Sequence, residues 1–201
     1  HHIAKNNMDV INMLNAKYFL VQGQNNQVRA QRNPGAIGNA WIVEDYRLVE
    51  NADEEINALD NFDPEQEAIV DMRFAEQLED FDNTSDPGAS IRLSGYQPNE
   101  LVYQFHSTED ELVVFSEIYY DKGWNAYVDG EKMPYFRANY VLRAMVVPEG
   151  KHEIIWKFEP AVYHTGGTIA GISSVLIILL FFAGIGKELR EKLKPVSAKK
   201  A

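Results

Sequence analysis

The sequence of 201 residues contains no cysteine, which excludes a disulfide scaffold, thiol catalysis and zinc or iron–sulfur sites built on thiolates. Basic residues are scarce, because 19 Lys and Arg stand against 30 Asp and Glu, and the net charge is −11. Such a chain is a poor partner for nucleic acid, whose binding depends on neutralising phosphates. Apolar residues make up 45% and charged residues 24%, which is typical of a folded protein and excludes wholesale disorder.

One long segment carries no charge at all. Residues 166–186 read GGTIAGISSVLIILLFFAGIG, and as a helix they would span roughly 31 Å, close to the hydrocarbon core of a bilayer. The alternative is a buried core helix, but such helices are usually shorter and keep a polar stripe. The sequence therefore predicts a transmembrane helix, with the lipid bilayer as a partner. Gly167, Gly171 and Ser174 have the small side chains and spacing that let another helix pack closely, so we expect other transmembrane helices of the same parent protein as neighbours.

The flanks of this segment predict its orientation. Residues 187–201 hold six Lys or Arg and two Glu, whereas the fifteen residues before the segment hold only Lys151 and Lys157. The positive-inside bias places such a tail in the cytoplasm. We therefore expect a protein of the cytoplasmic (inner) membrane, with residues 1–165 periplasmic or otherwise extracytoplasmic.

The start of the sequence bears on the size of the parent protein. No signal peptide precedes the part expected outside the cytoplasm, and the sequence begins with His1 rather than Met. We therefore expect the C-terminal piece of a longer protein that crosses the membrane several times. His1 and His2 are either native or the remnant of a tag.

Residues 1–85 predict an α+β lead-in. Apolar spacing predicts a helix over residues 9–16, and residues 17–22 and 40–49 have the composition of strands. Asn51 followed by Glu54 resembles a capping box and predicts a short helix after Asn51. Residues 67–74 fit either a strand or a helix. Residues 79–88 (EDFDNTSDPG) have the composition of a linker, since the glycine and glutamate expected of a calcium loop are missing.

Between residues 89 and 160 apolar residues alternate with polar ones, as in half-buried β-strands. The alternation is clear over residues 101–106, 124–129 and 152–158, and Asp129-Gly130 is a hairpin signal. About seven strands separated by regular turns indicate a mainly antiparallel β-sandwich of jelly-roll type. The predicted fold is therefore an α+β lead-in, this sandwich and a C-terminal transmembrane helix. The expected boundaries are residues 1–85, 86–162, 166–186 and 187–201.

The sequence contains no catalytic signature. None of the five histidines has a metal-ligand partner within its own element, and no Ser-His-Asp motif, P-loop or dinucleotide fingerprint occurs. We therefore assign no catalytic, cofactor-binding or metal-binding residue and expect no cofactor.

Aromatic residues are frequent between residues 119 and 140, with carboxylates, an amide and an arginine beside them. Such residues could stack on a sugar ring and hydrogen-bond its hydroxyls. The candidates for glycan contacts are Trp124, Tyr127, Asp129, Tyr135, Arg137, Asn139 and Tyr140. The alternative interpretation is that the aromatic residues belong to the sandwich core or to the membrane interface.

Several segments resemble the C-terminal signature of the bacterial YfhO membrane protein family. They are residues 119–130 (YYDKGWNAYVDG), 135–144 (YFRANYVLRA), 148–152 (PEGKH) and 158–160 (FEP), with further similarity at 13–19 (MLNAKYF) and 33–41 (NPGAIGNAW). The resemblance implies a polytopic protein similar to GT-C glycosyltransferases, which are thought to use lipid-linked (polyprenyl-phosphate) sugars outside the cytoplasmic membrane. It also implies a chain that ends in an extracytoplasmic β-rich domain and a final helix. No residue here matches the catalytic carboxylate that such enzymes carry in an early loop.

Together, these observations predict the extracytoplasmic accessory domain of a polytopic, glycosyltransferase-like membrane protein. The parent protein would transfer sugar from a lipid-linked donor to a cell-envelope glycan or lipid, and this fragment is not expected to be catalytic alone. One alternative is a membrane-anchored module that binds glycans or envelope proteins without catalysis. Another is a domain that only stabilises the helix bundle.

Overall fold

A computed structural model describes residues 2, 7–23 and 27–192 of the chain. The chain divides into two compact units, His1–Glu159 and Pro160–Ala201. The predicted boundary near residue 85 stays a prediction. Two of the sequence-based expectations, those for His1 and for the part of the basic tail from residue 193 on, lie outside the described residues.

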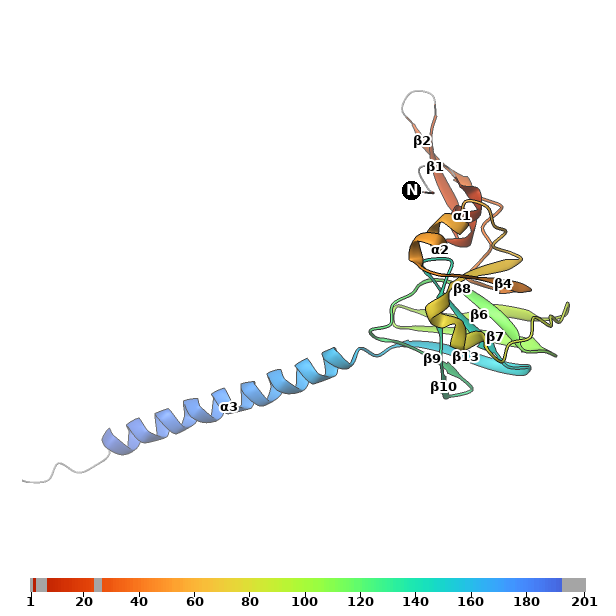
Figure 1. Cartoon of the computed structure of the whole chain (residues 1–201). Coiled ribbons are helices and arrows are strands. Elements are labelled where there is room, and N and C mark those ends of the chain that lie inside the picture. The colour runs from red at the N-terminus through yellow and green to blue at the C-terminus, as the bar shows by residue number, and fades with distance from the viewer. Residues whose placement is uncertain (1, 3–6, 24–26, 193–201) are drawn as a thin grey trace, which may run out of the picture. The chain divides into compact units, whose positions relative to one another are not determined.

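The described residues of the first unit form β-strands and three short helices (Figure 1). The helices are α1 (Met8–Met13), α2 (Ala52–Ala58) and the 3-10 helix η3 (Met72–Leu78). The strands are β1 (Tyr18–Gln22), β2 (Val28–Arg32), β3 (Ala40–Val43), β4 (Asp45–Val49), β5 (Glu67–Asp71), β6 (Ser90–Gln97), β7 (Glu100–Ser107), β8 (Glu111–Ile118), β9 (Trp124–Val128), β10 (Glu131–Met133), β11 (Phe136–Ala138), β12 (Leu142–Val147) and β13 (Gly150–Phe158).

Two sheets form the body of this unit. One has the strand order β10-β9-β13-β7-β6 and the other the order β3-β8-β12-β11-β5-β4. Their strands pair antiparallel, except that β4 and β5 are parallel. Strands β1 and β2 form a separate antiparallel hairpin. The predicted architecture, a mainly antiparallel sandwich after a small α/β start and before an apolar helix, is confirmed.

The six-stranded sheet is buried on both faces. Successive residues of β8 point to opposite sides, so Val113 and Phe115 join one apolar core while Leu112 and Val114 join the other. The first core also takes residues from the five-stranded sheet, including Trp156. The second core takes residues from the helical segments. The sheet therefore lies between the five-stranded sheet and the helical segments of the lead-in. Because β3, β4 and β5 of the lead-in are strands of this sheet, the lead-in is an integral part of the unit.

Two local sequence signals are confirmed. Asn51 caps α2, because its side-chain oxygen accepts hydrogen bonds from the backbone N–H groups of Asp53 and Glu54, and Glu54 in turn accepts one from Glu50 N–H. The β9–β10 hairpin turns at Asp129-Gly130, with positive φ angles of 51° and 89°. Such a turn needs positive φ at both central residues, which glycine and aspartate tolerate.

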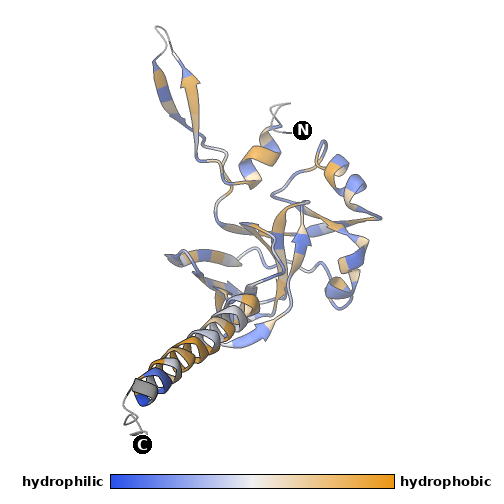
Figure 2. Cartoon of the chain, turned by 90° about the vertical axis from the view of Figure 1, so that its left-hand side faces the viewer, coloured by the Kyte–Doolittle hydropathy of each residue, from blue (hydrophilic) through white to orange (hydrophobic). Residues whose placement is uncertain are grey.

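The second unit is dominated by one helix, α3 (Ala161–Lys192), which contains the predicted segment 166–186. Large apolar side chains are exposed all along it, from Val162 to Leu189, and Figure 2 shows hydrophobic residues along much of the helix. Among the described residues, one helix is long and apolar enough to cross a bilayer, over Ala161–Arg190. A helix that is apolar all round needs either lipid or other helices around it.

Candidate functional site

The connection between β11 and β12 carries two of the candidate residues, shortly after Arg137 of β11, and has an unusual backbone. Asn139 and Tyr140 both have positive φ angles, 50° and 70°. Residues other than glycine keep such angles only where their surroundings hold them. The side-chain oxygen of Asn139 accepts the N–H of Ile69 at 2.8 Å, and its own N–H donates to the carbonyl of Ile69, also at 2.8 Å. The fully buried Asn139 therefore fixes this turn to the backbone of β5.

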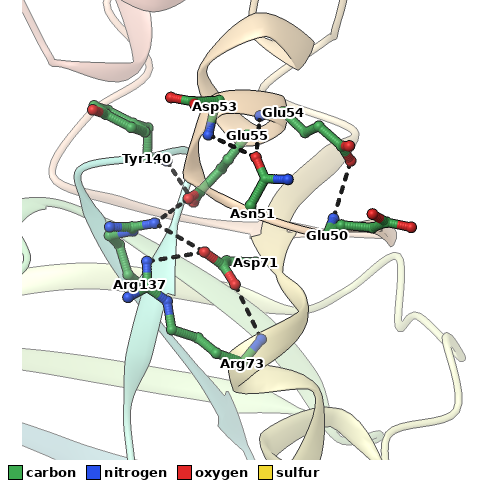
Figure 3. A network of polar contacts seen from close by, with 9 residues as sticks. All are labelled: Glu50, Asn51, Asp53, Glu54, Glu55, Asp71, Arg73, Arg137 and Tyr140. Atoms are coloured by element: carbon green, nitrogen blue, oxygen red, sulfur yellow. Dashed lines mark hydrogen bonds and ion pairs between the residues drawn. The ribbon is translucent and has the colours of Figure 1, made fainter.

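Beside this turn lies a network of buried charges (Figure 3). Arg137 forms an ion pair with Glu55 of α2 and lies 3.5 Å from Asp71, which also pairs with Arg73 at 2.9 Å. Glu55 is fully buried and accepts the Tyr140 N–H at 2.8 Å. Burial raises the pKa of Glu55, although the Tyr140 N–H and Arg137 both oppose that rise.

The chemical consequence is that the charge of Arg137 is already used. Its guanidinium balances two carboxylates from α2 and β5 and lies 5.4 Å from the centre of the Tyr140 ring. A buried arginine that loses such partners would be left uncompensated, which is costly. The network therefore attaches α2 to the six-stranded sheet.

A second group lies at the edge of the core between the sheets. Arg143 of β12 is 2% exposed and lies between the rings of Trp124 and Trp156, at 4.3 and 5.0 Å from their centres. Tyr135 stacks edge-on against Trp156 and donates its hydroxyl to the carbonyl of Trp124 at 2.9 Å. The Arg143 guanidinium thus sits in an aromatic cage, an arrangement that is favourable where water is excluded.

This cage leaves hydrogen-bonding groups unused. Within the described part of the chain, Arg143 Nη1, the Tyr103 hydroxyl and Trp156 Nε1 are buried without a protein partner. Burial raises the pKa of both Tyr103 and Glu117, and the positive charge of Arg143 opposes both rises. Buried polar groups of this kind usually bind ordered water.

A third group lies on the outward face of the five-stranded sheet. Tyr127 of β9 is half-buried and donates its hydroxyl to Glu159 at 2.7 Å, and Asn125 donates to the same carboxylate oxygen at 3.0 Å. Lys157 of β13 lies 6.0 Å from the centre of the Tyr127 ring. An aromatic ring here has a carboxylate, an amide and an ammonium around it, all reachable from solvent.

Asp129 has a separate role at the adjacent turn. Its carboxylate binds His152 Nδ1 at 2.6 Å and accepts the Glu153 N–H at 2.9 Å. His152 Nε2 lies 2.9 Å from the carbonyl of Glu149, so both ring nitrogens have partners. The hydrogen bond to Asp129 raises the pKa of His152 and lowers that of Asp129. This pair closes the β9–β10 hairpin onto β13.

The structure thus distributes the seven candidate residues over three places. Arg137, Asn139 and Tyr140 belong to the buried charge network, and Trp124 and Tyr135 belong to the arginine cage. Tyr127 and Asp129 lie on the outward side of β9 and at its turn. Whether any of them contacts a glycan stays a prediction.

Sequence reasoning did not identify three residues that complete these groups, namely Glu55, Asp71 and Arg143. A signal for Arg143 was present, because it interrupts the apolar run LRAMVV of a strand that is otherwise buried. Glu55 gave no such signal, since it lies among acidic residues at the start of α2.

A pocket of about 220 Å³ lies between η3 and the strands β10–β12. Its walls combine apolar side chains with three carboxylates, those of Glu76, Asp80 and Asp110. No cluster of three or more potential metal ligands occurs among the residues that the structure describes.

A family model described as bacterial membrane protein YfhO matches residues 75–170. Over these residues, which make up just under half of the chain, the sequence is similar to that family. The YfhO match begins within η3 and ends within α3, so it takes in the Arg137 turn, the Arg143 cage and the outward face of β9. It confirms the resemblance of the segments between residues 119 and 160 and supports association with a membrane, whereas the similarity at residues 13–19 and 33–41 lies outside the match and stays a prediction. Neither the curated proteins nor the solved structures include one that is significantly similar to the chain.

Proposed function

We propose that this chain is the extracytoplasmic accessory domain of a polytopic, GT-C-like glycosyltransferase. The parent protein would transfer sugar from a polyprenyl-phosphate donor to a cell-envelope glycan or lipid. The YfhO match carries this proposal, and the candidate membrane-spanning helix α3 supports it. In this scheme the chemistry belongs to other parts of the parent protein, and the β-sandwich positions the acceptor.

The proposal requires residues 1–165 to face away from the cytoplasm. The bias of basic residues toward residues 187–201 supports that orientation. Because these 201 residues contain no cysteine, a single Lys122→Cys substitution in an exposed turn provides a label site that is unique within them, and any cysteine elsewhere in the parent protein is first replaced by serine. A membrane-impermeant maleimide should label it on intact cells. Labelling only after lysis would show the opposite orientation and would remove the basis of the proposal.

Tyr127 is the candidate best placed to meet an acceptor sugar. Its ring is fixed by the hydrogen bond from its hydroxyl to Glu159, so little entropy would be lost when a sugar stacks on it. Asn125 and Glu159 could hydrogen-bond sugar hydroxyls, and Lys157 adds a further donor. By contrast, Arg137 pairs with Glu55 and Asn139 with Ile69, and the atoms of theirs that lack a partner among the described residues, Arg137 Nε and Asn139 Nδ2, are buried.

The test compares two tyrosines in the full-length protein of a bacterium that carries it. Tyr127→Ala should reduce the sugar content of the envelope polymer, measured by mass spectrometry, without reducing the amount of protein in the membrane. Tyr96→Ala is the matched control, because Tyr96 lies on β6 of the same sheet and is 69% exposed. Full sugar content in both variants would refute acceptor positioning by this face.

A deletion of the whole protein separates the remaining alternatives. The glycosyltransferase proposal expects one class of envelope sugar to disappear. If every envelope glycan persists while the purified chain binds glycan fragments, the protein is a binding module. If neither effect occurs, a purely structural role in the helix bundle remains.

A further inference from the structure

The hairpin of β1 and β2 is exposed along both strands. Neither strand pairs with another described strand outside the hairpin, and nine of its ten residues are exposed while the tenth is half-buried. Figure 1 shows the hairpin separate from the two larger sheets. An isolated two-stranded hairpin is marginally stable in water, so this one is expected to rest against a partner.

One face of the hairpin is largely apolar. The register pairs Tyr18 with Arg32, Leu20 with Ala30, and Gln22 with Val28, and side chains of paired residues share a face. On this face Tyr18 and Val28 are each 64% exposed and Leu20 is 77% exposed. Leaving three large apolar side chains of one hairpin exposed to water is unfavourable in free energy.

The charge of the hairpin is opposite to that of the chain. Residues 17–33 contain Lys17, Arg29 and Arg32 and no acidic residue, although the chain as a whole has a net charge of −11. None of these three cations forms an ion pair with a carboxylate of the described residues. The hairpin therefore presents unneutralised positive charge beside apolar side chains.

A pocket of about 220 Å³ lies at the base of the hairpin. It is lined by Lys17, Tyr18 and Arg32 from the hairpin and by residues of its two flanking segments, without any carboxylate. Asn15 also lines it, and Asn15 Oδ1 is buried with no hydrogen-bond partner within the described part of the chain. The pocket thus offers two cations for an anion and one free acceptor for a hydroxyl donor.

We propose that this pocket binds the headgroup of an anionic bilayer phospholipid of the phosphatidylglycerol type. Lys17 and Arg32 would hold the phosphate, and a glycerol hydroxyl would donate to Asn15 Oδ1. The exposed apolar side chains Tyr18, Leu20 and Val28 would enter the membrane interface. Cations at the base of an apolar face match an amphiphile better than a free anion, which would leave that face in water. The proposal concerns attachment to the membrane surface and does not depend on sugar transfer.

The experiment uses the full chain with Leu20→Cys, which is its only cysteine, labelled with an environment-sensitive fluorophore. The protein is placed in nanodiscs of phosphatidylcholine or of phosphatidylcholine mixed with phosphatidylglycerol. We expect a blue shift and brighter emission in the mixed discs only. Replacing Lys17 or Arg32 by Gln should raise the phosphatidylglycerol fraction at half-maximal shift about fivefold each, since a basic group near an anionic surface contributes about 1 kcal/mol.

The controls distinguish this proposal from its rivals. Arg92→Gln removes an exposed cation from β6 and should leave the shift unchanged. Thermal unfolding of each variant should match the parent chain, because Lys17 and Arg32 are exposed. Equal shifts with both lipids, or the absence of any shift, would refute headgroup recognition. Loss of the shift on adding inorganic phosphate would assign the pocket to free anions and would also overturn the lipid proposal.

Discussion

Removing the Arg137 guanidinium should destabilise the β-rich unit strongly. In Arg137→Ala, Glu55 keeps only the Tyr140 N–H, whereas Asp71 keeps Arg73 at 2.9 Å. Breaking a buried ion pair by removing one partner typically costs about 3–5 kcal/mol. Because one of the two carboxylates retains a cation, we expect a loss in the lower part of that range, about 3–4 kcal/mol.

The loss should depend on pH. Burial already raises the pKa of Glu55, and Arg137 is one of the groups that oppose the rise, so the substitution raises this pKa further. Between the ordinary pKa of a glutamate and the raised value, the folded chain binds more protons than the unfolded chain. The free energy of unfolding therefore falls as pH rises through this window. Arg137→Ala should be least damaging below about pH 4, where Glu55 is neutral in both states.

Urea unfolding of the full chain in a non-ionic detergent, followed by tryptophan fluorescence, provides the assay. All three tryptophans lie in the β-rich unit, so the signal reports on that unit. Arg47→Ala is the control, because Arg47 forms a more exposed pair with Glu67 and should cost less than about 1 kcal/mol. In Arg137→Ala, adding Glu55→Gln should recover part of the loss at neutral pH. A cost of Arg137→Ala as small as that of the control, or one independent of pH, would refute the reasoning.

Three further substitutions test neighbouring features by the same measurement. The pKa of His152 is raised mainly by Asp129, so their pair stabilises the fold at low pH, and this stabilisation is lost as pH rises through the raised pKa. His152→Gln should therefore flatten the dependence of the free energy of unfolding on pH. An unaltered pH profile would contradict the assignment. Trp124→Ala should lower the free energy of unfolding by about 3 kcal/mol, at the low end for such changes because the ring is half-buried over Arg143. A loss below about 0.5 kcal/mol would instead indicate that Trp124 is a surface residue free to contact a ligand. Gly150→Ala should lower the free energy of unfolding by about 1–3 kcal/mol, because φ is +130° and the added Cβ would lie 2.7 Å from His152 Nε2. An unchanged stability would contradict this geometry.

Sequence patterns predicted the parts of the fold in which one face meets water. The alternation over β7, β9 and β13 is visible because their outward faces are polar, and the Asp129-Gly130 turn follows from backbone sterics alone. Strand β8 behaves differently. Its run LVVF is apolar throughout because the six-stranded sheet is covered on both faces, so periodicity could not reveal which residues face which core.

The candidate site was harder to predict, since its interactions join distant segments. Arg137 and Glu55 are 82 positions apart, and nothing near Glu55 distinguishes it from the exposed Asp53 and Glu54 of the same helix. Its burial follows only from the packing of α2 beside the β11–β12 turn. The sequence therefore indicated Arg137 as a candidate for ligand contact but could not show that its charge is balanced by carboxylates within the fold.

This distinction changes what the YfhO-like signature of residues 135–144 implies. Three of its polar side chains are held by the fold: Arg137 balances two carboxylates, Asn139 holds β5, and Arg143 lies between two tryptophan rings. The atoms of these side chains that lack a partner among the described residues, Arg137 Nε, Asn139 Nδ2 and Arg143 Nη1, are buried. A ligand that bound these groups would first have to break their buried contacts. The free energy gained from a hydrogen bond to a sugar hydroxyl is smaller than the cost of breaking such contacts. A glycan contact in this domain is therefore better sought at Tyr127, where the polar groups around the ring remain accessible. On this argument, substitutions in the signature should act through folding, whereas substitutions around Tyr127 should change modification of the envelope and leave folding intact.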